Sequence, residues 1–129
     1  MSVQLTIVTP SRIAFEGPAV EVQIPGVFGE MGILPGHASL LTLGRPGVVT
    51  VHNGADTKRI LVGKGIAEVG NEQVTLLVEL CEDTSTIDKD AARSVLKKAQ
   101  GDFKSATPGT PEHTSATDRI ALSQARIDA

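Results

Sequence analysis

The sequence predicts an α+β fold, in which an N-terminal antiparallel β-sandwich is followed by a C-terminal α-helical hairpin. Short β-branched runs bounded by Gly, Pro, Asn or Asp follow one another from Val3 to Val78, with no helical pattern between them. After Cys81 the apolar residues recur every three or four positions instead of every two. A chain of 129 residues with 40% apolar content can bury one modest core. We therefore expect a sandwich domain over residues 1–86 and a two-helix domain over residues 87–129.

The strands are predicted by alternation of apolar and polar side chains, which indicates that one face of each strand is exposed to water. Val3, Leu5 and Ile7 alternate with Gln4 and Thr6, and Val20, Val22 and Ile24 alternate with Glu21 and Gln23. The further runs are Val48–Val51, Ile60–Val62, Ile66–Val69 and Val74–Val78. Short strands at such close spacing indicate an antiparallel sandwich or a flattened barrel.

Glycine and proline concentrate between Gly29 and His37, in the segment Gly-Glu-Met-Gly-Ile-Leu-Pro-Gly-His, where the chain must turn at least twice. This segment predicts a structured loop between strands. The segment Gly63–Gly65 lacks the spacing of a phosphate-binding loop, and a strand follows it where such a loop requires a helix. We expect a tight hairpin turn there.

The first helix is expected from about Ile87 to Lys104, with Thr86 as its N-cap. Asp88 and Asp90 would lie in its first turn, where the helix dipole favours negative charge. Its apolar stripe consists of Ala92, Leu96, Ala99 and Phe103.

The second helix is expected from about Ser115 to Ile127, after a linking loop of about residues 105–114 that holds two prolines and a glycine. It would present Ala116, Ile120 and Ile127 on one side. Both stripes are rich in alanine, so their burial yields little free energy at about 25 cal/mol per Å². We expect the hairpin to dock loosely, as a regulatory element would need.

Composition excludes several functions. The net charge is −3 and only three residues are aromatic, which argues against nucleic acid as a partner. The three histidines and one cysteine have no zinc-like spacing, so we expect neither a metal nor another cofactor. No apolar run approaches about 18 residues, and the N-terminus has no signal or transit pattern, so we expect an intracellular chain without membrane spans.

Charge also divides the chain near Thr86. Residues 1–86 carry five basic and nine acidic side chains, a net charge of −4, whereas residues 87–129 carry seven basic and six acidic side chains, a net charge of +1. The hairpin is therefore the more basic of the two parts.

Four segments carry a resemblance to a known family. The segment Gly29–Thr42 closely resembles the most characteristic segment of the epsilon subunits of bacterial F-type ATP synthases. Leu5–Pro10, Gly63–Val69 and the alanine-rich C-terminal segments are similar to the family's segments in the same order. The resemblance implies a β-sandwich with a helical hairpin, and a non-catalytic subunit of the rotor's central stalk.

The same resemblance implies partners and a location. It implies binding to the gamma subunit and the proteolipid c-ring, which couples proton translocation to ATP synthesis. It also implies that the hairpin inhibits ATP hydrolysis by meeting the beta subunit, at the cytoplasmic face of the cell inner membrane.

Candidate contact residues follow from the resemblance. Glu30, Met31 and His37 would contact the rotor ring or the gamma subunit, although a local backbone partner would also explain His37. Basic residues of the hairpin would meet an acidic segment of the beta subunit. The candidates are Lys89, Arg93, Lys97 and Arg126. Lys104 projects on the same side of the first helix as Lys89, Arg93 and Lys97.

Ile87, Asp88 and Ala92 partly match the nucleotide-binding motif that some bacterial members carry. The arginine position of that motif holds Ala91, which removes the strongest phosphate-binding group. We expect ATP to bind weakly or not at all.

Two other functions compete with this interpretation. A small β-barrel hydrolase would use His37 or Cys81, but we expect no paired base, no oxyanion device and no positive neighbour that would lower the pKa of Cys81. A free-standing small-molecule or nucleotide-binding β-sandwich regulator would need the arginine that Ala91 replaces.

Overall fold

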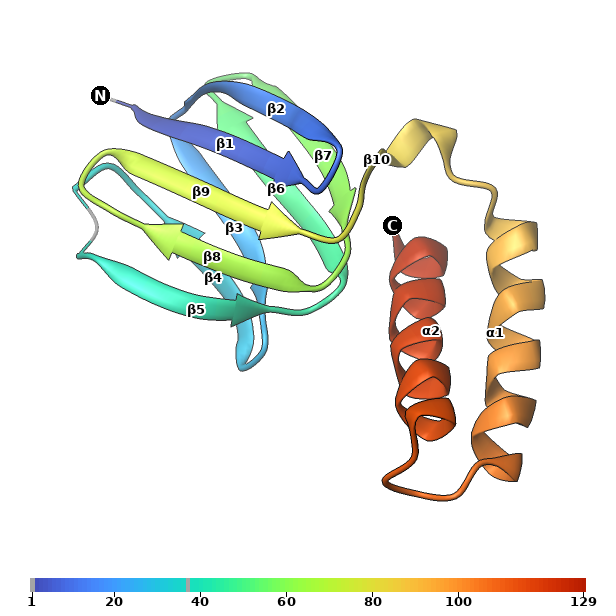
Figure 1. The fold of residues 1–129 in the computed structure, drawn as a ribbon. Coiled ribbons are helices and arrows are strands. Elements are labelled where there is room, and N and C mark those ends of the chain that lie inside the picture. The colour runs from blue at the N-terminus through green and yellow to red at the C-terminus, as the bar shows by residue number, and fades with distance from the viewer. Residues whose placement is uncertain (1, 37) are drawn as a thin grey trace.

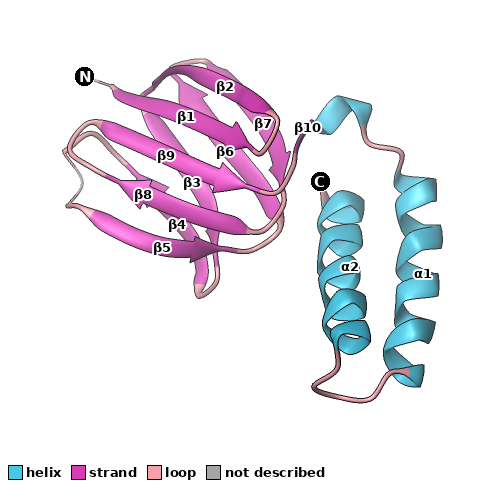
Figure 2. Cartoon of the chain, viewed as in Figure 1, coloured by secondary structure: helices cyan, strands magenta, loops and turns pink. Residues whose placement is uncertain are grey.

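A computed structural model describes residues 2–36 and 38–129, so the contact predicted for His37 lies outside the described residues. Within these residues, ten strands precede a 3₁₀ turn and two helices (Figures 1 and 2). The strands are β1 (Val3–Thr9), β2 (Arg12–Ala19), β3 (Glu21–Gly26), β4 (Gly29–Ile33), β5 (Leu40–Gly44), β6 (Gly47–Asn53), β7 (Asp56–Val62), β8 (Gly65–Val69), β9 (Gln73–Val78) and β10 (Cys81–Asp83). The turn is Thr84–Thr86, and the helices are α1 (Lys89–Ser105) and α2 (Pro111–Asp128).

The strands form two layers that face each other across the core (Figure 1). One layer has the order β10-β7-β6-β3, with β4 on β3, and the other has the order β5-β8-β9-β1-β2. β3 joins the layers, because its first residues pair with β6 while Gly26 pairs with Gly44 of β5. The predicted sandwich is confirmed, with a barrel-like connection at β3.

Strand pairing departs from the sequence prediction in three places. β1 pairs with β9 in parallel, whereas the other pairs are antiparallel. The expected loop after Gly29 begins instead as strand β4, which pairs with β3 along Val22–Gly26. Gly63–Gly65 is not a hairpin turn, because β7 and β8 belong to different layers. Gly65 is required there, since a Cβ at this position would lie 2.0 Å from the Leu77 carbonyl oxygen.

The core is built from β-branched and leucine side chains of both layers, as the alternation predicts. Its buried members are Val3, Leu5, Ile7, Ala19, Val22, Ile24, Ile33, Val49, Val51, Ile60, Val62, Ala67, Val69, Val74, Leu76 and Val78. None of these residues belongs to the helices. Val20 is 46% exposed, contrary to the predicted alternation, because it precedes β3 instead of lying inside it.

Helix boundaries differ from the predictions at the N-termini. α1 is capped by Asp88, whose Oδ1 accepts a hydrogen bond from the Ala91 N–H at 3.0 Å, and Thr86 ends the preceding 3₁₀ turn. α2 begins at Pro111, four residues before the predicted start, with Thr110 as its cap. Proline is tolerated in the first helical turn, where its missing N–H has no intrahelical partner. The linking loop is correspondingly shorter than residues 105–114.

The two helices pack through small side chains. Ala92 and Ala99 of α1 and Ala116 of α2 are buried, as the predicted stripes require. Phe103 remains 40% exposed and contacts the ring of His113, with 4.5 Å between the ring centroids. In the part of the chain that the structure describes, neither helix has the length and hydropathy needed to cross a membrane.

Candidate interaction surfaces

One layer of the sandwich carries an outward row of apolar side chains that crosses five strands. Leu43 of β5 lies opposite Ile66 of β8, which lies opposite Leu77 of β9. Leu77 in turn pairs with Val8 of β1, and Val8 with Ile13 of β2. We call these five residues the apolar row.

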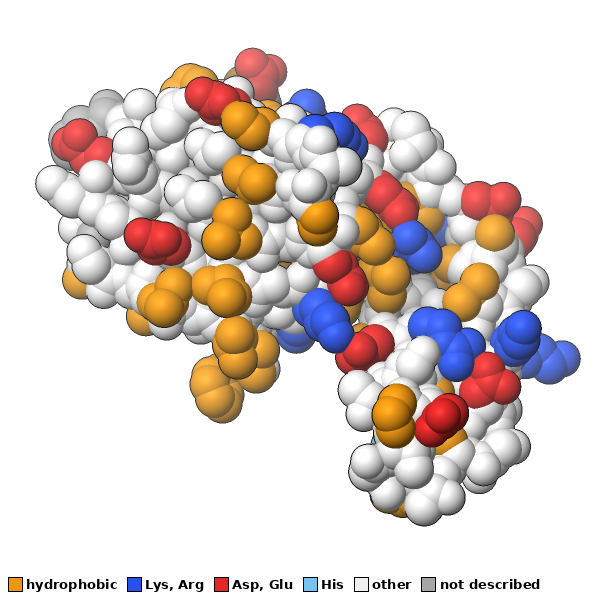
Figure 3. Space-filling view, viewed as in Figure 1, with side chains coloured by type: hydrophobic (Ala, Val, Ile, Leu, Met, Phe, Trp, Pro, Cys, Tyr) orange, Lys and Arg blue, Asp and Glu red, His pale blue; other side chains and the backbone are white. Residues whose placement is uncertain are grey.

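The apolar row is accessible to a partner. Leu43 and Ile13 are 60% and 59% exposed, and Leu77 and Ile66 are 48% and 40% exposed. Figure 3 shows hydrophobic side chains gathered over the strands of this layer. Soluble monomers rarely expose large contiguous apolar patches without a binding role. Sequence reasoning missed this row, although the run Leu40–Leu43 carries leucine on both faces of one strand.

The β3–β4 hairpin presents a second surface at one end of the sandwich (Figure 1). Glu30 is exposed, and its Oε1 accepts a hydrogen bond from Arg45 Nη2 at 3.2 Å. Arg45 Nε also donates to the Gly26 carbonyl oxygen at 3.1 Å, which fixes the base of the hairpin. Met31 is only partly exposed, because it packs against the core. The apolar tip, Phe28, is fully exposed and was not among the predicted contacts.

The basic residues predicted on the hairpin differ in the contacts that they make. Arg93 forms an ion pair with Asp90 on α1 at 2.8 Å, and Lys89 Nζ donates to the Ala129 carbonyl oxygen at 2.7 Å. Lys97 is exposed and forms no ion pair with the described residues. Arg126 instead binds Glu82 of β10, on the sandwich. These four residues therefore have different roles in the isolated chain.

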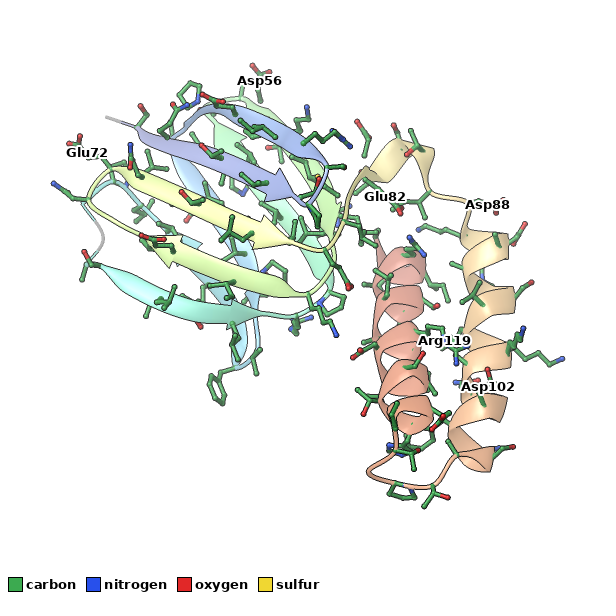
Figure 4. The ribbon with its side chains drawn as sticks, viewed as in Figure 1. Asp56, Glu72, Glu82, Asp88, Asp102 and Arg119 are labelled. Atoms are coloured by element: carbon green, nitrogen blue, oxygen red, sulfur yellow. The ribbon has the colours of Figure 1, made fainter. Side chains whose placement is uncertain are left out.

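The residues of the degenerate nucleotide motif are used structurally. The Asp88 carboxylate caps α1, and Ala92 is buried where the helices pack together. On the inner face of the hairpin, Arg119 Nη1 donates to Asp102 Oδ2 at 3.0 Å (Figure 4). That guanidinium is thus already neutralised by a carboxylate of α1.

Cys81 is a half-buried residue at the start of β10. Burial raises the pKa of its thiol, and the nearby Arg12 and Lys58 oppose that shift only in part. The expectation that Cys81 has no positive neighbour is therefore wrong, yet the effect of burial exceeds that of the two cations and favours the neutral thiol. Among the residues that the structure describes, no three His, Cys, Asp or Glu side chains form a group that could hold a metal ion.

Together the sandwich, its uncovered apolar row and the appended hairpin define a protein that works by binding other proteins. Residues 2–84 match the family model of the beta-sandwich domain of the ATP synthase delta/epsilon chain. The ATP synthase epsilon chain of Parasynechococcus marenigrum is 37% identical over the whole of this chain and 96% of its own length. The chain belongs to the ATP synthase epsilon chain family, whose members are non-catalytic subunits of that complex.

Solved structures agree on the fold. A chain in the cryo-EM structure of the Euglena gracilis mitochondrial ATP synthase, OSCP/F1/c-ring, superposes with a TM-score of 0.82 at 20% identity, over 96% of this chain and 78% of that one. A chain of the Tetrahymena thermophila mitochondrial ATP synthase central stalk/c-ring structure gives 0.69 at 13% identity, over 98% and 97% of the two chains. At these identities the likeness concerns the fold alone.

Proposed function

We propose that the chain is a central-stalk subunit of a bacterial F-type ATP synthase, peripheral to the cytoplasmic face of the cell inner membrane. In this role its sandwich joins the gamma subunit to the proteolipid c-ring, and its hairpin restrains ATP hydrolysis at the beta subunit. Structures of the same fold come from assemblies titled F1/c-ring and central stalk/c-ring, which supports this placement.

The apolar row carries the proposal. It spans the whole width of one layer and stays exposed in the isolated chain, so a partner must cover it to remove it from water. The gamma subunit is the partner we assign to this row. The β3–β4 hairpin, with Phe28, Glu30 and Met31, is then the contact for the c-ring.

The test of assembly is Leu43→Asp, which places a charge at one end of the apolar row. It should abolish copurification with the gamma subunit while leaving the folded chain intact by circular dichroism, because Leu43 is exposed in the isolated chain. Val20→Asp is the matched control, since Val20 is similarly exposed but lies outside the row. Normal assembly of the Leu43 variant would refute the proposed interface.

The proposal for the hairpin concerns the exposed cations of α1. Since single exposed ion pairs contribute little, several cations must act together, and their effect should fade with salt. Replacement of Lys89, Arg93 and Lys97 by alanine should therefore raise ATP hydrolysis in the assembled complex at low ionic strength. Equal hydrolysis with and without residues 87–129, at low and high salt, would remove the regulatory part of the proposal.

ATP is not a ligand in this proposal. Asp88 and Ala92 are engaged in the cap and in helix packing, and Ala91 offers no guanidinium to a phosphate. Calorimetric titration of the isolated chain should give no binding at micromolar ATP. Saturable micromolar binding would support the nucleotide-binding alternative.

A further inference from the structure

Two ion pairs tie α2 to the sandwich at separate points. Lys64 Nζ, in the segment between β7 and β8, lies 2.7 Å from Asp118 Oδ2. The Arg126 guanidinium binds both carboxylate oxygens of Glu82 in β10, with Nε 3.3 Å from Oε2 and Nη2 2.5 Å from Oε1. The two α2 residues are eight positions apart, which is about 12 Å along the helix. Figure 4 shows Glu82 beside the end of the sandwich that the hairpin approaches.

The apolar part of this contact centres on Leu61. Its neighbours Ile60 and Val62 belong to the sandwich core, so Leu61 points to the opposite face of β7, and yet it is fully buried. Its cross-strand partners on that face are Val48 and Glu82. α2 lies against this face, since it contacts β6 and lines a hollow together with Val48.

The packing around Leu61 does not fix how α2 sits. A hollow of about 390 Å³ remains between α2 and the sandwich, with Ala121 and Ala125 on one side and Val48 and Arg59 on the other. Hydrophobic burial is also non-directional, so Leu61 alone would allow α2 to turn about the contact. Two separated ion pairs remove that freedom.

We infer that Lys64–Asp118 and Glu82–Arg126 form a two-point latch. This latch fixes the orientation of the docked hairpin and sets the fraction of molecules in which the hairpin is docked. Arg126 and Asp118 are then positioning residues of this chain. The latch rests on the proposed function only for its consequence, since a released hairpin would be free to reach the beta subunit.

The two points of the latch differ in strength. The Arg126 and Glu82 side chains are 27% and 31% exposed and make two parallel hydrogen bonds, whereas Lys64 and Asp118 are 51% and 43% exposed and make one. Bidentate, partly desolvated pairs are stronger than exposed single contacts. Breaking Glu82–Arg126 should therefore raise the ratio of undocked to docked hairpin about fivefold. Breaking Lys64–Asp118 should raise it less.

The experiment measures this ratio in the isolated full-length chain. Nitroxide labels at the exposed positions Glu68 and Gln100, in a Cys81→Ser background, report the distance between sandwich and hairpin by pulsed electron resonance. Glu82→Arg and Arg126→Glu should each broaden the distance distribution and shift it to longer values. The double variant, which restores an opposite-charge pair, should return it to that of the parent.

Controls separate the latch from unfolding and from the proposed function. Asp90→Arg breaks the ion pair within α1 and should leave the distances unchanged. Glu82→Gln leaves both helices untouched and should still increase the undocked fraction. Parent-like distances in all single variants, or no recovery in the double variant, would overturn the latch. A confirmed latch with unchanged ATP hydrolysis of the Arg126→Glu complex would overturn only the regulatory proposal.

Discussion

Removal of the hairpin should leave a folded sandwich. Deletion of residues 87–129 exposes Leu61, at a cost of about 1.5–3 kcal/mol for a leucine side chain, and removes the Glu82–Arg126 pair, at a cost of about 1 kcal/mol. The sum of about 2–4 kcal/mol is smaller than the stability of most domains, which is about 5–15 kcal/mol. The buried core cluster keeps all of its members, because none lies in the helices.

The assay is urea unfolding of residues 1–86 and of the full chain, followed by circular dichroism because the chain has no tryptophan or tyrosine. A cooperative transition should persist, with its stability reduced by the amount above. Leu61→Thr should destabilise the full chain by about 1–3 kcal/mol but change the stability of the shortened chain by less than about 0.5 kcal/mol, because residue 61 is then exposed in both the folded and the unfolded state. An unfolded fragment at ambient temperature, or a loss above about 5 kcal/mol, would refute the independence of the sandwich.

Three further predictions concern single residues. Ile33→Ala should cost about 2–5 kcal/mol in urea unfolding, because Ile33 is fully buried in β4, whereas Leu41→Ala, at 68% exposure, should change stability by less than about 0.5 kcal/mol. Gly65→Ala should destabilise the folded chain by about 1–3 kcal/mol or more, since the new Cβ meets the β9 backbone. Gly101→Ala, which has open space around it in α1, should instead stabilise the chain by about 0.5–1 kcal/mol. Equal effects of the two substitutions would contradict the crowding at Gly65. Because burial raises the pKa of the Cys81 thiol, iodoacetamide should alkylate it more slowly at about pH 8 in the folded chain than in urea, and equal rates would contradict its burial. For the same reason Cys81 favours the folded state below the thiol's ordinary pKa and loses that contribution as the pH rises through its raised value.

The sequence by itself determined the two-part α+β architecture and most of the core. Alternation with a period of two places Val3, Leu5 and Ile7 on one face wherever their strand lies, because the pleat fixes the direction of each side chain. The change to a period of three to four likewise fixes a helical hairpin with alanines in its seam. Glycine at position 65 could be recognised, but the close approach of β9 that requires it could not.

The tertiary structure alone decided which strands are neighbours and which surfaces they build. The apolar row draws one residue from each of five strands, and its register depends on the parallel pairing of β1 with β9, which no local pattern encodes. The Glu82–Arg126 pair joins residues 44 positions apart, so in the sequence Arg126 is one more exposed cation, and only the position of α2 beside β10 gives it a partner. Local periodicity reports the face of an element, whereas contacts between elements depend on burial and pairing summed over the whole chain.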